Sequence, residues 1–144
     1  MNFLKHWFSG FEKGMTELPE EAQNCLLGAC AKACSQSYSL QVYKEIRDKS
    51  KDVCEFFDNL REAIPVIDIL EIQAGTHYAV CYHKCLCDLF TEGWMKEGVL
   101  CECSRQSLLY NLRQVFPEKD IQVQLEQSIL RGDKGCRLDV IISE

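Results

Sequence analysis

Residues 121–142, with the sequence IQVQLEQSILRGDKGCRLDVII, decide the fold. Apolar and polar residues alternate in two runs of this stretch, at 121–126 and at 136–142. When apolar and polar residues alternate with a period of two residues, one face of the strand packs on the core and the other faces solvent. The intervening residues 131–135, RGDKG, are typical turn residues. The stretch therefore predicts an antiparallel hairpin.

A second hairpin and a helix are predicted upstream of this stretch. Residues 66–82 are rich in β-branched side chains on either side of a turn at 73–76, which predicts two paired strands. Ser104 is suited to cap a helix over residues 104–116, and Pro117 ends that helix.

The first half of the chain is predicted to be helical. Pro19 and the two carboxylates after it begin a helix that runs to about Gln36. Apolar residues between positions 40 and 63 then recur with a helical period, in two helices separated near Ser50, a candidate N-cap.

The order of these elements predicts an α+β fold. We expect N-terminal helices packed on an antiparallel β-sheet built from two hairpins (66–82 and 121–142), with a helix at 104–116. The 144 residues contain no linker, low-complexity run or internal repeat, which predicts a single domain over residues 1–144.

Charge and hydropathy exclude some classes of partner. The net charge of -6 would repel a phosphate backbone, and no basic stripe offsets it, so we expect no nucleic acid partner. Residues 1–14 are aromatic, but Lys5 and His6 interrupt them, and the apolar runs are too short for a signal sequence or a membrane span. The prediction is a cytoplasmic protein without a membrane span.

The first segment has an amphipathic pattern. Its apolar side chains follow helical spacing: Leu4, Trp7, Phe8 and Phe11. Insertion into a membrane surface is one interpretation. Because only Lys5 and Lys13 add positive charge there, we favour the interpretation that these apolar side chains cover the core or form a subunit contact. A homodimer is therefore possible.

Ten cysteines are the most unusual feature of the composition. In a cytoplasmic protein they are expected to stay reduced. They are Cys25, Cys30, Cys34, Cys54, Cys81, Cys85, Cys87, Cys101, Cys103 and Cys136. Cys25 and Cys54 each stand alone on a predicted helix and are interpreted as packing residues. Cys30 and Cys34 lie one helical turn apart, and packing and a share in a metal site are equally open for them.

The densest cysteine run is CYHKCLC at residues 81–87, followed by CEC at 101–103. Zinc sites take four ligands, commonly as two short thiol pairs separated by a loop. The predicted metal ligands are Cys85, Cys87, Cys101, Cys103 and Cys136. Zinc is the expected ion, and an iron–sulfur cluster is the alternative because four cysteines serve either metal.

The same thiols suggest catalysis as a second interpretation. Cys101 and Cys103 precede the helix predicted at Ser104, where free backbone N–H groups and the helix dipole favour a thiolate. His83 lies within the first cysteine run and is a candidate ligand or base. A cysteine-dependent hydrolase would use Cys103 or Cys101 as nucleophile and His83 as base.

The second half of the chain also carries a family resemblance. The Gly-Asp turn at 132–133, followed by Cys136 and an alternating strand, resembles the closing hairpin of the 4-vinyl reductase domain superfamily. The thiol pairs at 85–87 and 101–103 look like those of cysteine-rich bacterial proteins related to L-2-amino-thiazoline-4-carboxylic acid hydrolase. The resemblance covers residues 65–144. It implies helices followed by an antiparallel sheet that encloses a pocket, a fold shared with trafficking-complex subunits.

The resemblance also implies a ligand set. Phenol-sensing members of that superfamily bind zinc near this hairpin through cysteines and a glutamate, which implies a role for Cys136 and then for Cys101. The cysteine usually found before the Gly-Asp turn is Ser128 here. The resemblance then implies that one of three other thiols replaces that cysteine as a zinc ligand: Cys85, Cys87 or Cys103.

The favoured function is a small-molecule-binding module with an apolar pocket between helices and sheet and a cysteine-ligated, zinc-type site. One alternative is a hydrolase of a small cyclic or thioester substrate, and another is an iron–sulfur or redox protein. The sequence contains no phosphate-binding loop, G-x-S-x-G or H-E-x-x-H motif, so a hydrolase would have to use cysteine.

Overall fold

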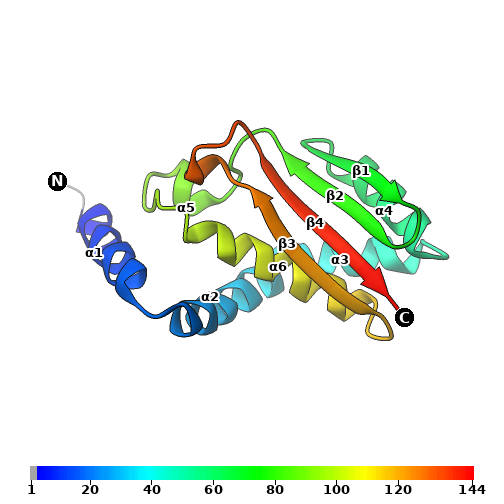
Figure 1. Cartoon of the computed structure of the whole chain (residues 1–144), viewed down its shortest axis with the longest axis horizontal. Coiled ribbons are helices and arrows are strands. Elements are labelled where there is room, and N and C mark those ends of the chain that lie inside the picture. Colours follow the sequence, from blue (N-terminus) through cyan, green and yellow to red (C-terminus); the bar gives the residue numbers. More distant parts are fainter. Residues whose placement is uncertain (1–2) are drawn as a thin grey trace.

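Four strands form one antiparallel sheet in the order β1-β2-β4-β3 (Figure 1). The computed structural model describes residues 3–144. The strands are β1 (Ile67–Gln73), β2 (His77–Tyr82), β3 (Asp120–Gln127) and β4 (Cys136–Ser143). Both predicted hairpins are confirmed, and β2 pairs with β4 to join them into one sheet.

Helices cover one face of this sheet (Figure 1). The α-helices of the described residues are α1 (Phe3–Glu17), α2 (Glu20–Cys34), α3 (Leu40–Asp48), α4 (Val53–Ala63), α5 (Asp88–Thr91) and α6 (Leu100–Val115). The helices α4 and α6 pack on the sheet, α3 packs on both of them, and α2 lies beside α6. The predicted α+β fold, with N-terminal helices on an antiparallel sheet, is confirmed.

Two predicted helix starts differ from the structure. Helix α6 begins at Leu100, one turn before Ser104. Its start has no side-chain cap, and the N–H groups of residues 100 and 101 bond to the carbonyl oxygens of residues 97 and 98. The residue that caps α4 is Asp52, whose carboxylate accepts a hydrogen bond from the Glu55 N–H at 2.8 Å. Ser50 is instead buried, and its hydroxyl donates to the Ile46 carbonyl.

The chain also stays helical between the helix predicted to end near Gln36 and the next one, predicted to begin near residue 40. A π-helical turn, η1 (Ser35–Ser39), joins α2 to α3 without a loop. A short 3-10 helix, η2 (Ile129–Arg131), lies in the connection between β3 and β4. Neither has a strong signal in the sequence, because both depend on how the chain packs nearby.

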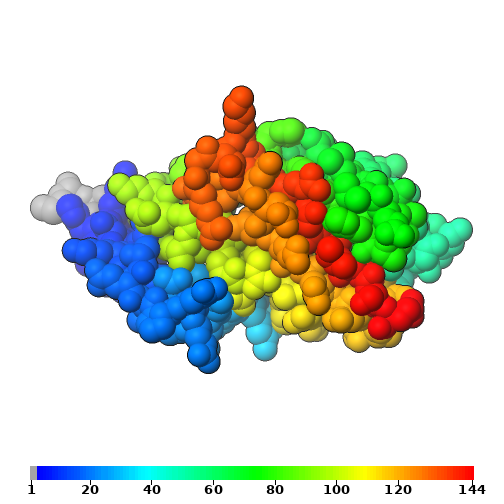
Figure 2. All heavy atoms as spheres, viewed as in Figure 1, coloured from blue at the N-terminus to red at the C-terminus, as the bar shows by residue number. Residues whose placement is uncertain are grey.

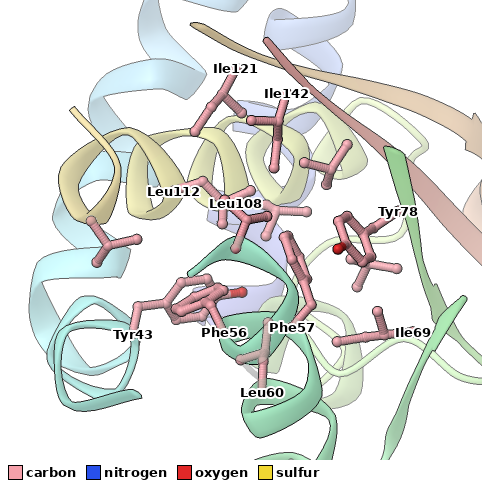
Figure 3. Close-up of a cluster of buried hydrophobic side chains, with 14 of the residues drawn as sticks. Tyr43, Phe56, Phe57, Leu60, Ile69, Tyr78, Leu108, Leu112, Ile121 and Ile142 are labelled. Carbon is pink, nitrogen blue, oxygen red and sulfur yellow. The ribbon is translucent and has the colours of Figure 1, made fainter. Parts of the chain in front are cut away.

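The core fills the space between the helices and the sheet (Figure 3). Phe57 on α4 stacks on Tyr78 of β2, with ring centroids 4.1 Å apart, and Phe56 meets Phe116 edge to face. Leu112 of α6 is fully buried among them. Burial of this much apolar and aromatic surface is the main stabilising term of the fold.

None of the helices in residues 3–144 covers the other face of the sheet, and Figure 2 shows strand segments on the surface there. On this face Leu70 and Ile72 of β1 are each 49% exposed. Helix α1 stands at one end of the molecule, where Phe8 contacts Trp94 and the Glu12 carboxylate accepts two backbone N–H bonds from residues 96 and 97. No helix within residues 3–144 has the length and apolar character needed to cross a bilayer.

Candidate functional site

All ten cysteines are free thiols. Cys25, Cys30 and Cys34 are exposed on α2, and Cys101 on α6 is buried. The five predicted metal ligands lie at the end of the molecule formed by α5, the start of α6 and the β3–β4 connection. They fall in two neighbourhoods, and Cys87 lies near members of both.

We call Cys85, Cys101 and Cys136 the hairpin thiols, because they surround the β3–β4 connection. The Cys101 sulfur lies 2.9 Å from the Ser128 hydroxyl, and the Ile129 N–H donates to the Cys136 sulfur at 3.3 Å. Burial raises the pKa of Cys85, and the charges of Cys87, Cys101 and Cys136, in that order, add to the rise. Three of the five predicted ligands are therefore close neighbours.

Local backbone geometry explains why the hairpin thiols come together. Gly132 has φ 102°, a left-handed conformation that glycine adopts without strain. The Asp133 carboxylate accepts the Ser128 N–H at 2.8 Å, which closes the loop on itself. At Gly135 a Cβ would lie 3.1 Å from the Tyr82 carbonyl oxygen, so the chain passes close to β2 there. The turn thus holds Cys136 beside the start of α6.

Cys87 and Cys103 belong to the second neighbourhood, which includes Cys30 and Cys34 of α2. We call these four the helix thiols. Burial raises the pKa of Cys103 to about 12, and the thiols of Cys34, Cys30 and Cys87 contribute further to that rise. Burial also raises the pKa of Cys34, with Cys87 as the next cause. Cys30 and Cys34 therefore lie near predicted ligands that are far from them in sequence.

The side chains described here do not form a closed metal centre. Within residues 3–144, no group of three or more His, Cys, Asp or Glu side chains is arranged to hold an ion as it stands. Zinc ligation by the predicted thiols, and the iron–sulfur alternative, stay predictions.

The predicted catalytic group is not assembled in the way the hydrolase hypothesis requires. His83 is exposed and pairs with Asp68 of β1, and no hydrogen bond joins it to Cys101 or Cys103 in the described residues. Helix α6 contains both thiols, and burial raises the pKa of each above its ordinary value. These shifts run opposite to the low-pKa expectation, and burial is the largest cause of each.

Two hollows lie on the surface of the described residues. One, of about 580 Å³, lies between the ends of α3 and α6 and is lined by polar side chains such as Lys44, Arg47 and Glu118. The other, of about 400 Å³, borders α2, Glu102 and Arg131. Neither contains a cysteine, and both open widely to solvent.

Sequence analysis did not predict a polar network that lies on the open face of the sheet. His77 Nε2 lies 2.8 Å from an Asp139 carboxylate oxygen, and the Arg137 guanidinium bonds the same carboxylate at 2.7 Å. Asp139 is only 7% exposed, although it is a carboxylate on the face of the sheet away from the main core. Arg137, followed by the His77 hydrogen bond, lowers the pKa of Asp139 against the effect of its burial.

Sequence analysis also gave Cys54 no part in a functional site, because this cysteine stands alone in the sequence. It follows the first residue of α4 and is half-buried. The hydroxyl of the buried Tyr78 accepts the Gly75 N–H and donates to the Cys54 sulfur at 3.4 Å. Helical spacing, which puts Phe57 one turn further along α4, is the signal that could have placed Cys54 at the edge of the core.

Alkaline pH is expected to destabilise the protein through one half-buried thiol, Cys103, and one half-buried phenol, Tyr82. Burial raises the pKa of Cys103 from near 9.0 to about 12, and that of Tyr82 from near 10.0 to about 12. The folded state then binds these protons more tightly than the unfolded state. The resulting stabilisation is complete below pH 9 and is lost as the pH rises towards 12. Urea unfolding at successive pH values should show this decline.

Two alanine variants test the origin of the alkaline effect. Cys103→Ala should flatten part of the decline between pH 9 and 12. Cys25→Ala, at an exposed position on α2, should keep the wild-type profile. Parallel profiles for wild type and Cys103→Ala would show that this thiol is not a source of the effect.

Comparison with known proteins defines the fold class. No protein-family model matches the chain, and no curated protein sequence matches it. The arrangement of helices on one face of a four-stranded antiparallel sheet is found in solved α+β structures. One is a trafficking protein particle complex subunit 3 from Naegleria fowleri, covalently bound to palmitic acid. It matches with a TM-score of 0.51 at 12% sequence identity, over 98% of this chain and 93% of that chain.

At this level of identity, the likeness is one of fold. The predicted sharing of a fold with trafficking-complex subunits is therefore confirmed. Membership of the 4-vinyl reductase superfamily, and kinship with the thiazoline hydrolases, gain no support from a family model or a curated sequence.

Proposed function

We propose that the chain is a small-molecule-binding module that carries a fatty acyl chain as a thioester on Cys54. The observation that carries the proposal is the hydrogen bond from Tyr78 to the Cys54 sulfur. Tyr78 is 1% exposed and stacks on Phe57, so the sulfur lies at the boundary between solvent and the main apolar core. A chain attached there has an apolar environment within reach.

Chemistry favours Cys54 among the ten thiols for this role. Within the described residues, it is the thiol that is hydrogen-bonded to a member of the main core. Burial, and then the hydrogen bond to Cys54, raises the pKa of Tyr78. The phenol therefore stays protonated at neutral pH and can donate to the sulfur. The half-buried thiol also remains accessible to an acyl donor from outside.

The acyl transfer needs a thioester donor of the acyl-coenzyme A class. The Cys54 sulfur attacks the donor carbonyl, a new carbon–sulfur bond forms, and the donor thiol leaves with the proton that Cys54 loses. No oxidant or reductant is required. Each methylene group that is then buried contributes about 0.8 kcal/mol.

The likeness to the trafficking subunit supports an acyl ligand. That protein has the same fold over nearly the whole of this chain and was solved covalently bound to palmitic acid. In this chain, the space between α4 and the sheet is filled by core side chains. We therefore expect α4 to move outward on acylation, on the side where Val42 and Ile64 are half-buried against the core.

Acylation can be tested by incubating the purified protein with palmitoyl-coenzyme A and measuring the intact mass. The expected result is one palmitoyl group per chain, released by neutral hydroxylamine as a thioester should be. Cys54→Ser should lose this modification, and Cys25→Ser should retain it as a matched exposed thiol.

A change in the core should accompany the modification. The thermal midpoint of the acylated protein should rise, because the chain buries apolar surface that is otherwise in water. An unmodified wild type, or equal labelling of Cys25 and Cys54, would rule out the proposal.

A further inference from the structure

The sheet ends in two outer strands, β1 on one side and β3 on the other. Within residues 3–144, neither strand has a strand neighbour on its outer side, so backbone N–H and C=O groups point outward there. A row of such groups is a template on which another chain can add a strand. Helix α4 packs next to β1, and α6 packs next to β3 (Figure 1). Side chains of these two helices can therefore reach the outer edges.

Arg61, in the last turn of α4, occupies the outer edge of β1. Its Nε and Nη2 groups both donate to the Ile69 carbonyl oxygen, at 3.1 and 2.9 Å. Its Nη1 group donates to the Asp58 carboxylate at 3.0 Å, which holds the guanidinium in place. Residues two apart on a strand point their backbone groups to the same edge, and the Ile67 N–H bonds the Ile64 carbonyl. Two outward groups of β1 are thus already bonded within the chain.

Two arginines of α6 occupy the outer edge of β3 in the same way. Arg105 Nη1 donates to the Val123 carbonyl at 3.0 Å, and Arg113 Nη2 donates to the Ile121 carbonyl at 3.2 Å. The Glu102 carboxylate accepts two further N–H bonds from Arg105, at 2.8 and 2.7 Å, and so fixes its position. Both outer edges of the sheet therefore carry guanidinium groups on outward carbonyl oxygens.

The β1 strand has the greater tendency to pair with another chain. Its open face carries Leu70 and Ile72, each 49% exposed, and Val66 just before the strand is 52% exposed. The open face of β3 instead carries polar side chains such as Gln122 and Gln124. Short apolar segments of high β propensity on a sheet edge are prone to pair with copies of themselves.

From these contacts we infer that Arg61, Arg105 and Arg113 close both outer edges of the sheet to strand addition, and that Arg61 masks β1 from the β1 strand of a second copy. The guanidinium satisfies the carbonyl that a new strand would need, and it places a charge where that strand would lie. A second copy would bring its own Arg61 to the same place, so two like charges would meet. The inference is independent of Cys54 and of acylation.

Arg61→Met tests the inference, because methionine is also unbranched but removes both donors and the charge. Its side chain is 41% exposed, so the fold should persist, with an unchanged far-ultraviolet circular dichroism spectrum. Sedimentation velocity at rising protein concentration should show a species of about twice the wild-type mass. Asp58→Asn is the matched control. It removes the ion pair of Arg61 but keeps the bonds to Ile69, and it should sediment as the wild type does.

A second variant separates strand pairing from general apolar association. In Arg61→Met/Glu71→Pro, proline removes an outward N–H of β1, because Glu71 points its backbone groups to the same edge as Ile69. This variant should return to the wild-type mass. Folded Arg61→Met that keeps the wild-type mass would overturn the inference, and so would association that Glu71→Pro does not reverse. If Arg61→Met loses its fold, Arg61→Gln provides the same test with a polar side chain.

Discussion

Replacing Phe57 with alanine is expected to lower the free energy of unfolding by about 3–5 kcal/mol. The side chain is fully buried, stacks on Tyr78 and meets Phe56 edge to face at 5.3 Å (Figure 3). Its removal leaves a cavity between α4 and the sheet that the surrounding rings fill only in part. Because natural domains are stable by about 5–15 kcal/mol, this one change would remove a large share of the total.

Urea unfolding followed by circular dichroism measures the loss. Tyr38→Ala is the matched control, because Tyr38 is also aromatic but 75% exposed, and its change should stay within about 0.5 kcal/mol. Similar unfolding midpoints for Phe57→Ala and Tyr38→Ala would contradict the described core.

Replacing Asp139 with alanine is expected to cost about 2 kcal/mol at neutral pH. The carboxylate is nearly buried and accepts hydrogen bonds from both Arg137 and His77. Without it, two basic side chains lie together on the open face of the sheet with no acceptor between them. Asp68→Ala is the matched control on the same face, and its exposed pair with His83 should contribute less than about 1 kcal/mol.

The loss at Asp139 should depend on pH. Arg137 is the main cause that holds the pKa of this carboxyl below its ordinary value near 3.8. A lowered pKa gives stabilisation that is present above the ordinary value and is lost as the pH falls through the lowered one. Wild type and Asp139→Ala should therefore converge in stability at strongly acidic pH. A constant difference between them down to that range would show that the lost contacts are not electrostatic.

Much of the fold could be predicted because its signals are local. The alternation in residues 121–142 predicts β3 and β4, and the β-branched residues on either side of the turn in 66–82 predict β1 and β2. Helix starts were less well predicted. Ser104 and Ser50 are good capping residues, but neither caps a helix in the structure. Helix α6 begins earlier, at Leu100, and Asp52 provides the side-chain cap of α4. A cap preference of about 1 kcal/mol is easily outweighed by tertiary packing.

The candidate sites were harder to predict because their members are distant in sequence. Cys54 meets Tyr78 across 24 residues, and His77 meets Asp139 across 62. The neighbourhood of Cys103 depends on the register between α2 and α6, which small side chains set through contacts across 72 residues. Spacing between neighbouring cysteines therefore grouped Cys101 with Cys103, although they face different surroundings on α6.

The sheet order has a consequence for synthesis of the chain. The β1–β2 hairpin can form as soon as it leaves the ribosome, but the free edge of β2 is unpaired until β4 has been synthesised. Contacts between β2 and β4 join residues that are distant in sequence, such as His77 and Asp139, which are 62 residues apart. Until then β2 presents an unpaired edge of the kind that recruits other chains. Translation at about 5–20 residues per second leaves that edge open for seconds. A nascent-chain chaperone that shields β2 would therefore matter more for the yield of this protein than for its final stability.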